Sequence, residues 1–180
     1  MRTDRAMFAA GCFWGVEATF RKLDGVVSTR VGFAGGHLDH PTYKDLCSGK
    51  SGHAETVAVE FDPTKISYAE LLDTFWSCHD PTELNITGAA EGEPERSIIF
   101  VHDAEQQRLA NASRDEVNAS RVFREKIRTE ILAAAQFYPA EEDHQQYLAK
   151  QGSETSCHVG EIEVRTKLAT TARDALRRGN

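Results

Sequence analysis

Cys12 stands where an apolar strand is expected to end and a helix to begin. Residues 9–17 read Ala-Ala-Gly-Cys-Phe-Trp-Gly-Val-Glu. At the start of a helix, unpaired backbone N–H groups and the positive end of the helix dipole favour a thiolate over a thiol, and the thiolate is the nucleophile. The sequence therefore predicts a reactive cysteine at position 12.

Phe13 and Trp14 follow this cysteine directly. Adjacent residues of a helix point in different directions, so the two rings cannot share one face and at least one is expected near the thiol. The alternative is that both are ordinary core aromatics, since large apolar side chains are most often buried. Local physics leaves both interpretations open.

The remaining cysteines, Cys47, Cys78 and Cys157, show no paired Cys-x-x-Cys spacing. Four cysteines in 180 residues are too few for a disulfide scaffold, and their spacing does not fit a structural zinc site. Because free cysteine is among the most buried residue types, Cys47 and Cys78 are expected to be core thiols.

His37, Asp39 and His40 offer nitrogen and oxygen donors that a metal ion could use. Glycine and proline flank the segment, however, which favours a solvated loop. We therefore expect neither a metal nor a cofactor. His53 and His79 are expected to be structural hydrogen-bonding residues.

Composition excludes several function classes. The 180 residues carry 21 Lys and Arg against 28 Asp and Glu, a formal net charge of −7. No stretch combines basic with interleaved aromatic residues, so nucleic-acid binding is not expected. The apolar runs are far shorter than the roughly 20 residues that span a bilayer, and no signal-like apolar core follows the N-terminal residues. The sequence predicts one domain, residues 1–180, in a soluble cytoplasmic protein without membrane contact.

Alternating strands and helices predict the fold class. Apolar and β-branched runs predict strands at about residues 6–10, 26–33, 54–61, 96–102 and 127–132. Ser67 and Glu70 form a capping box that opens a helix, and Asp103 with Gln106 opens another in the same way. Two successive strand-helix-strand units indicate an α/β (α+β) fold, a two-layer sandwich with a ferredoxin-like mixed sheet core. The C-terminal segment is expected to be irregular, with a polar terminal helix at 161–178.

The Gly-Cys-Phe-Trp-Gly run at 11–15 resembles the fingerprint of the A class of peptide-methionine sulfoxide reductases. The resemblance continues in the family's order over about residues 6–158. Its further motifs are VGFAGG at 31–36, PTY at 41–43, CSG at 47–49, GHAE at 52–55, FW at 75–76, HDP at 79–81, FYPAE at 137–141 and HQQY at 144–147. On these motifs the chain is identified as a member of that family.

The resemblance implies reduction of the S epimer of methionine sulfoxide, free or in proteins. Cys12 matches the nucleophile, which would be left as a sulfenic acid. Phe13 and Trp14 match the apolar wall that holds the substrate's methyl group. Glu55 matches the acid that meets the sulfoxide oxygen, which requires an enclosed site that raises its pKa. Without the family match, the strand pattern favours a surface carboxylate at this position. Tyr43 matches one of two tyrosines that hold the same oxygen.

Cys157 matches the resolving cysteine, because it follows the HQQY motif at about the family's usual distance. The resemblance implies that it attacks the sulfenic acid to form a disulfide, which thioredoxin or another thiol reductant reopens. Cys78 is the alternative resolving thiol.

The loop between Pro81 and Ser97 departs from the family pattern. Typical members carry an active-site aspartate where this chain has Ala90, and the second oxygen-binding tyrosine where it has Glu95. If Glu95 is ionised near Glu55, it raises the pKa of that acid further. The departure keeps two alternatives open: a related enzyme acting on another sulfoxide or oxidised sulfur compound, and a non-catalytic redox sensor.

Overall fold

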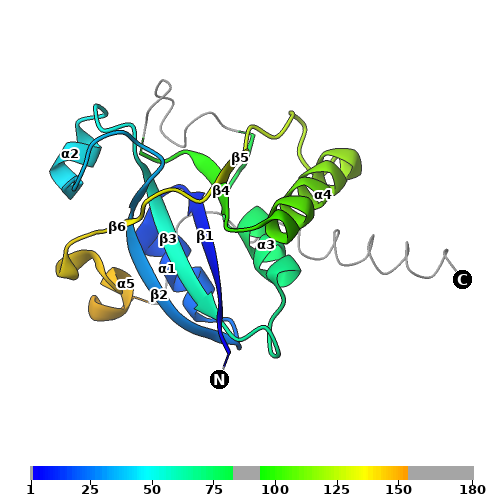
Figure 1. The fold of residues 1–180 in the computed structure, drawn as a ribbon, viewed down its shortest axis with the longest axis horizontal. Coiled ribbons are helices and arrows are strands. Elements are labelled where there is room, and N and C mark those ends of the chain that lie inside the picture. Colours follow the sequence, from blue (N-terminus) through cyan, green and yellow to red (C-terminus); the bar gives the residue numbers. More distant parts are fainter. Residues whose placement is uncertain (1, 83–93, 154–180) are drawn as a thin grey trace, which may run out of the picture.

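A computed structural model describes residues 2–82 and 94–153 of the chain (Figure 1). Three features discussed above lie outside the described residues. They are the changed position Ala90, the resolving candidate Cys157 and the terminal helix expected at 161–178.

Six strands of the described residues form one mixed sheet. They are β1 (Asp4–Ala10), β2 (Val26–Ala34), β3 (Ala54–Phe61), β4 (Ser97–Val101), β5 (Glu130–Ala133) and β6 (Tyr138–Pro139). Their order is β5-β4-β1-β3-β2-β6, in which β4 and β5 are parallel and the other neighbours are antiparallel. The five predicted strands are confirmed to within a few residues. The sequence pattern misses β6, because two residues are too short to show an alternation.

The four central strands have the order β4-β1-β3-β2 and are all antiparallel. Helix α1 (Phe13–Arg21) joins β1 to β2, and α3 (Tyr68–Ser77) joins β3 to β4. This arrangement is the ferredoxin-like core that the two strand-helix-strand units predict. The remaining helices are α2 (Tyr43–Cys47), α4 (Ala104–Ser120), α5 (Tyr147–Lys150) and a 3-10 turn at Glu142–His144.

Two helices begin at the predicted caps. Ser67 and Glu70 form both hydrogen bonds of the capping box at the start of α3. Asp103 caps α4 by accepting from the backbone N–H of Gln106 at 2.8 Å. The Gln106 side chain does not complete a box; it accepts from the backbone N–H of His102 and donates to the carbonyl of Arg5. The start of α4 is therefore predicted correctly, but the Gln106 side chain binds the backbone of β1 and does not complete a capping box.

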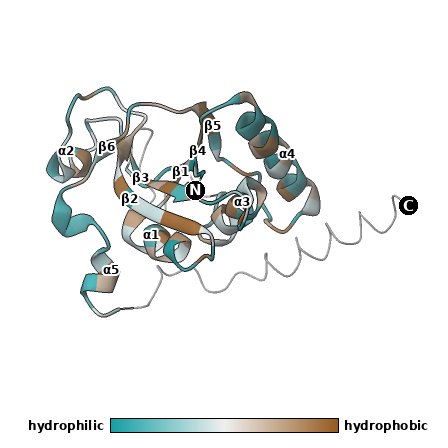
Figure 2. Cartoon of the chain, turned by 60° about the horizontal axis from the view of Figure 1, so that its bottom comes forward, coloured by the Kyte–Doolittle hydropathy of each residue, from teal (hydrophilic) through white to brown (hydrophobic). Residues whose placement is uncertain are grey.

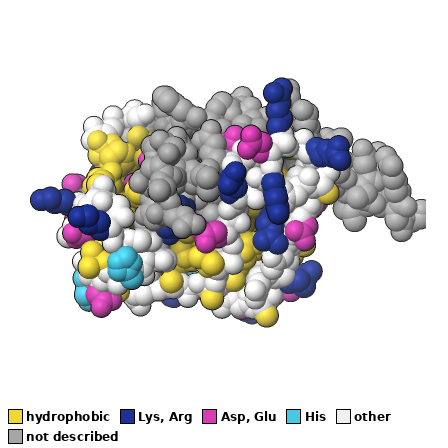
Figure 3. Space-filling view, turned by 90° about the horizontal axis from the view of Figure 1, so that it is seen from above, with side chains coloured by type: hydrophobic (Ala, Val, Ile, Leu, Met, Phe, Trp, Pro, Cys, Tyr) yellow, Lys and Arg dark blue, Asp and Glu magenta, His cyan; other side chains and the backbone are white. Residues whose placement is uncertain are grey.

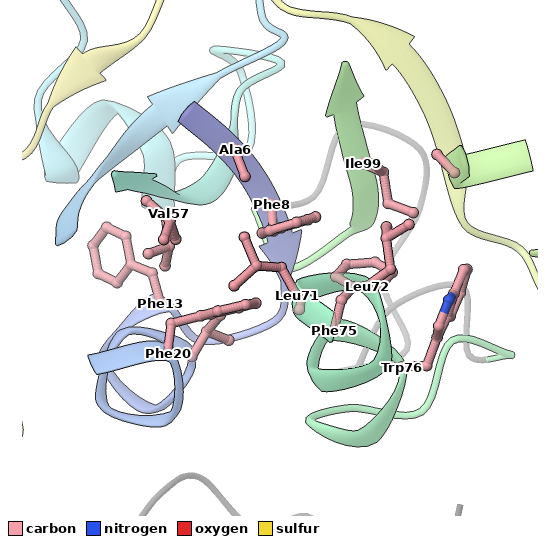
Figure 4. Packing of buried hydrophobic residues seen from close by; sticks show 14 of the residues in the cluster. Ala6, Phe8, Phe13, Phe20, Val57, Leu71, Leu72, Phe75, Trp76 and Ile99 are labelled. Carbon is pink, nitrogen blue, oxygen red and sulfur yellow. The ribbon is translucent and has the colours of Figure 1, made fainter. Parts of the chain in front are cut away.

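The main core lies between the sheet and helices α1 and α3, which cover the same face (Figure 4). Phe8 of β1 stacks on Phe20 of α1 with ring centroids 5.1 Å apart, and its ring centroid lies 5.5 Å from that of Phe75 in α3. Burying one such ring contributes about 1.5 to 3 kcal/mol. These contacts fix the end of β1 and the start of α1 relative to the sheet.

The opposite face of the sheet carries a smaller apolar cluster. Met7 and Ala9 point to this side because successive side chains of a strand alternate between faces, and they pack with Ile98 and Phe100. Phe137, in the irregular segment before β6, packs against this cluster. The two-layer arrangement and the irregular segment that follows β5 agree with the predicted fold.

The surface is mixed in character. Hydrophobic residues concentrate on the strands, α1 and α3, whereas α4 is mostly hydrophilic (Figure 2). On the face seen in Figure 3, Lys and Arg side chains are interleaved with Asp and Glu side chains. No helix in residues 2–82 and 94–153 combines the length and apolar character needed to span a membrane.

Candidate active site

Cys12 is the N-cap residue of α1, as the sequence predicts. β1 ends at Ala10, and Gly11 turns the chain with a φ of 89°, a conformation that glycine adopts without steric strain. The carbonyl of Cys12 then accepts the first helical hydrogen bond, from the backbone N–H of Val16. The cysteine is partly exposed at this helix start. Strand, turn and helix dipole thus present an accessible thiol where a thiolate is favoured.

Glu55 lies beside this helix start, near the beginning of β3, and its side chain is 5% exposed. Its Oε2 accepts a hydrogen bond of 2.8 Å from the backbone N–H of Phe13. Burial raises the pKa of Glu55 to about 8; the bond from Phe13 lowers it, while the charges of Cys12 and Glu95 raise it. A large fraction of this buried acid therefore carries its proton at neutral pH.

Glu95 is held next to Glu55 by the backbone. The N–H of Glu55 donates a hydrogen bond of 2.6 Å to the carbonyl of Pro94, the residue before Glu95. The charge of Glu95 is one of the causes that raise the pKa of Glu55. The Glu95 carboxylate is thus close enough to Glu55 to favour the neutral form of that acid.

Tyr43 reaches the same region from the start of α2. A capping box between Thr42 and Asp45 fixes this short helix. The Tyr43 ring packs against Phe13, with centroids 6.1 Å apart. Burial raises the pKa of the Tyr43 hydroxyl, and the charges of Glu55, Cys47 and Cys12 raise it further. The hydroxyl is therefore protonated at neutral pH and able to donate.

Phe13 and Trp14 differ in burial. Phe13 is 1% exposed and packs between Trp14, Phe33 and Tyr43, whereas Trp14 is only partly buried. Phe13 is thus a core residue, and Trp14 packs against the core but is partly exposed. Trp14 therefore keeps a partly accessible aromatic surface two residues after Cys12.

Two further aromatic residues, for which no role was predicted, complete this wall. Tyr147 stacks on Trp14, with ring centroids 4.0 Å apart and an angle of 15° between the rings. His144 accepts a hydrogen bond of 3.3 Å at Nδ1 from Nε1 of Trp14, and its ring centroid lies 4.3 Å from that of Tyr43. Both residues belong to the HQQY motif. His144 is 130 residues from Trp14, and at such a separation the sequence pattern does not indicate a contact.

Two buried side chains hold the HQQY segment against α1 and β2. The amide of Gln145 accepts from the backbone N–H of Val31 at 2.9 Å and donates to its carbonyl at 2.8 Å. Glu17, 1% exposed on α1, accepts from the backbone N–H of Gln146 at 2.8 Å and from the hydroxyl of Thr29. These bonds place His144 and Tyr147 over Trp14.

The described cysteines other than Cys12 differ in accessibility. Cys78, at the end of α3, has its pKa raised to about 12 by burial, as expected of a core thiol. Cys47 is exposed, so its prediction as a core thiol is wrong. Helix α2 has only five residues and buries Leu46, which leaves the next side chain facing outward. Cys47 also contributes to the raised pKa of Tyr43 and so lies near its hydroxyl.

Two histidines have structural roles. His53 is buried, accepts from the backbone N–H of Gly36 at Nδ1 and bonds the carbonyl of Leu38 through Nε2. His79 bonds the carbonyl of Phe75 and the hydroxyl of Ser97, and burial lowers its pKa to about 4. Within the part of the chain that the structure describes, no three His, Cys, Asp or Glu side chains are grouped so as to hold a metal ion.

Comparison with known proteins matches this geometry to a family. The family model of peptide methionine sulfoxide reductase matches residues 4–176. The chain belongs to this family. It is 58% identical over 149 residues to peptide methionine sulfoxide reductase MsrA of Methanothermobacter thermautotrophicus, covering 83% of this chain and 88% of that protein.

Solved structures of the family agree in fold. The reduced form of Mxr1 from Saccharomyces cerevisiae superimposes with a TM-score of 0.77 at 32% identity, over 87% of this chain and 90% of that one. Mxr1 has also been solved in complex with Trx2, and that structure gives a TM-score of 0.58 at 27% identity over 81% of this chain and 85% of that one. The peptide methionine sulfoxide reductase fold therefore extends over both strand-helix-strand units and the segment that carries His144.

Proposed function

We propose that this chain reduces the S epimer of methionine sulfoxide, free or in proteins, with Cys12 as the nucleophile. One observation carries the proposal. The accessible thiol of Cys12 lies at a helix start, and the next backbone N–H, that of Phe13, binds a buried and largely neutral Glu55. The family assignment and the relatives named for this activity support it.

In the first step, the Cys12 thiolate attacks the sulfoxide sulfur while Glu55 gives its proton to the sulfoxide oxygen. Oε2 of Glu55 is occupied by the N–H of Phe13, which leaves Oε1 to carry that proton. The S–O bond breaks, the oxygen passes to Cys12 as a sulfenic acid, and the thioether methionine leaves. Sulfur of the substrate is reduced by two electrons and Cys12 is oxidised by two.

The surrounding side chains supply binding and orientation. We assign the Tyr43 hydroxyl to the sulfoxide oxygen, because it is protonated and electrostatically coupled to Cys12 and Glu55. We assign Phe13 and Trp14 to the substrate's methyl group, which has no hydrogen-bonding atom and favours an aromatic surface. His144 and Tyr147 support that surface from behind.

In the second step, the Cys157 thiol attacks the Cys12 sulfenic acid to give a disulfide and water. In support of this assignment, Cys157 follows Ser153 by four residues in the sequence, and Ser153 lines the same groove as Trp14. Cys78 is less suited, because a thiol with a pKa near 12 provides little thiolate at neutral pH.

Thioredoxin, or another dithiol, reduces the disulfide. The structure of Mxr1 bound to Trx2 supports this partner. We further propose that residues 1–180 act as one domain, since the family model spans 4–176, and that the protein works in the reducing cytoplasm, where free thiols persist.

The decisive experiment is a single turnover of the fully reduced protein with each epimer of methionine sulfoxide in the absence of a reductant. We expect about one equivalent of methionine from the S epimer. Attack of Cys157 on the oxidised Cys12 does not increase this yield, because no reductant is present to reopen the disulfide. Cys12→Ser should release none. Product release by Cys12→Ser, or an equal yield from the R epimer, would contradict the proposal.

A further inference from the structure

A groove runs along α1 from the active-site wall toward the far end of the helix. It has a volume of about 710 Å³ and lies between α1 and α5. Its α1 side is formed by Trp14, Glu17, Ala18, Arg21 and Lys22. Its other side is formed by residues of the 146–153 segment, including Leu148 and Ala149. We call it the α1–α5 groove.

The groove meets the proposed methyl site at Trp14. Trp14 belongs to both, because it lies two residues after Cys12, in the first turn of α1, and also lines the groove. A polypeptide whose oxidised methionine reaches Cys12 enters this groove if it leaves the site past Trp14. The small side chains of Ala18 and Ala149 leave space there for an extended backbone.

The spacing along α1 sets where the groove ends. Trp14, Ala18 and Arg21 are separated by four and then three residues, so they follow one face of the helix. At a rise of 1.5 Å per residue, Arg21 and Lys22 lie about 10 to 12 Å from Trp14 along the axis. An extended peptide covers about 3.3 Å per residue. Its third or fourth residue beyond the oxidised methionine therefore arrives at these two side chains.

The far end of the groove is positively charged in a chain whose formal net charge is −7. Arg21 and Lys22 are both exposed. Arg21 and Lys150 are close enough to Glu17 for their charges to lower its pKa, which burial raises. Glu17 itself is buried and engaged by Thr29 and Gln146. No acidic side chain in residues 2–82 and 94–153 forms a salt bridge with Arg21.

We propose that the α1–α5 groove binds the substrate polypeptide and that Arg21 and Lys22 select an Asp or Glu three or four residues from the oxidised methionine. The proposal rests on the proposed function and adds a substrate class to it: oxidised methionines in extended, acidic segments. Exposed charge pairs contribute modestly and are screened by salt. The preference is therefore a few-fold and declines at high ionic strength.

The test uses blocked peptides that contain one methionine-S-sulfoxide in a neutral background. Two peptides carry Asp at the third and fourth positions, one on the N-terminal and one on the C-terminal side, and two matched peptides carry Lys. We expect kcat/KM for the better Asp peptide to exceed that of its Lys counterpart by about three- to tenfold at low salt, the scale of two exposed charge pairs. The side that shows the effect gives the direction of the chain in the groove.

Two double variants locate the effect. Arg21→Glu with Lys22→Glu should bring the ratio of Asp to Lys peptides below one. Arg21→Gln with Lys22→Gln, which disturbs the helix end less, should bring it to about one. The control, Arg124→Glu with Lys126→Glu, makes the same charge change at exposed positions on the loop after α4 and should leave the ratio unchanged.

A second readout separates this proposal from the proposed function. Anisotropy of labelled Asp and Lys peptides bound to Cys12→Ser measures selection without turnover, and free methionine-S-sulfoxide measures chemistry without flanking residues. Reduction of the free substrate with equal binding of all peptides would overturn the groove proposal alone. Selective binding with no reduction of any substrate would overturn the proposed function alone. An equal loss of preference in the control variant would also overturn the groove proposal.

Discussion

The backbone N–H of Phe13 donates a 2.8 Å hydrogen bond to Oε2 of Glu55, so the buried acid of β3 is held against the first helical residue after Cys12. Two effects compete at this contact. The helix start favours an anion, whereas burial favours the neutral acid. Burial dominates, because the pKa of Glu55 lies near 8 rather than at its usual 4.5. The helix start thus favours a thiolate on Cys12, whereas burial keeps the proton on Glu55.

The first prediction concerns pH. Glu55 acts as an acid only when protonated, so the rate of single-turnover reduction should fall on the alkaline side as pH rises through about 8. Glu95→Gln removes a charge that raises this pKa, so the alkaline decline should move to lower pH. Glu130→Gln, an exposed change of equal charge on β5, is the control. If the rates of Glu95→Gln and Glu130→Gln decline at the same pH, the role given to Glu95 is contradicted.

The second prediction follows from the same pKa through stability. Because the folded-state pKa of Glu55 exceeds its ordinary 4.5, the neutral carboxyl's contribution is complete below about pH 4.5 and is lost as pH rises to about 8. Glu55→Gln keeps a neutral acceptor for Phe13 and removes this loss. We expect the variant to be inactive yet more stable than the parent above pH 8, by on the order of a few kcal/mol, with little difference at pH 4.5. The free energies of unfolding are measured with urea at pH 4.5 and above pH 8. The same difference between variant and parent at both pH values would refute the prediction.

The third prediction concerns the resolving thiol. Cys157→Ser should complete one turnover and accumulate a sulfenic acid at Cys12 that a dimedone-type probe labels, whereas the parent protein should form a disulfide. Cys78→Ser is the matched control and should still form that disulfide, because its thiol is buried. Peptide mapping after substrate oxidation identifies the pair. A disulfide between Cys12 and Cys78 would transfer the role to Cys78.

The fourth prediction tests how the aromatic wall is held. The Gln145 side chain bonds the backbone of Val31 twice and donates to the carbonyl of Ala140 at 3.0 Å. Gln145→Ala removes all three hydrogen bonds. The Val31 carbonyl keeps its bond from the N–H of Ala140, but the N–H of Val31 loses its Gln145 acceptor, which costs about 1 to 3 kcal/mol. We expect a lower unfolding free energy and a higher KM, since His144 and Tyr147 lose their anchor. Gln151→Ala, an exposed glutamine at the end of α5, should change neither quantity.

How much of this could be predicted from the sequence depended on the range of the interactions. The Cys12 helix start and the Ser67 cap depend on neighbouring residues, and both were predicted correctly. Glu55 is different, because its burial results from packing across β3, α1 and the 94–95 segment, and local pattern alone favours a surface position. The stacking of Tyr147 on Trp14 joins residues 133 positions apart, for which one sequence contains no periodic signal. Cys47 was predicted wrongly, because composition favours burial while a five-residue helix buries only Leu46.

The last prediction concerns the loop that departs from the family pattern. Ala90→Asp together with Glu95→Tyr introduces the active-site carboxylate and the oxygen-binding hydroxyl that the family resemblance implies for this loop. The pair should raise kcat/KM for methionine-S-sulfoxide by about tenfold or more, the scale of one recovered hydrogen bond in the transition state. Both changes are made together because neighbouring active-site groups are rarely additive.

The same double variant also alters the acid. Replacing Glu95 removes one cause of the raised pKa of Glu55, so the gain should be largest at pH 6 to 7 and shrink toward pH 8. The single variant Glu95→Gln measures this electrostatic part separately, because it removes the charge without adding a hydroxyl. If the double variant is no faster at any pH, Tyr43 and Glu55 already suffice, or the site is adapted to another sulfur compound. A panel of sulfoxides with the parent protein distinguishes these: the first case requires methionine-S-sulfoxide to be the best substrate, and the second requires that another compound is reduced faster.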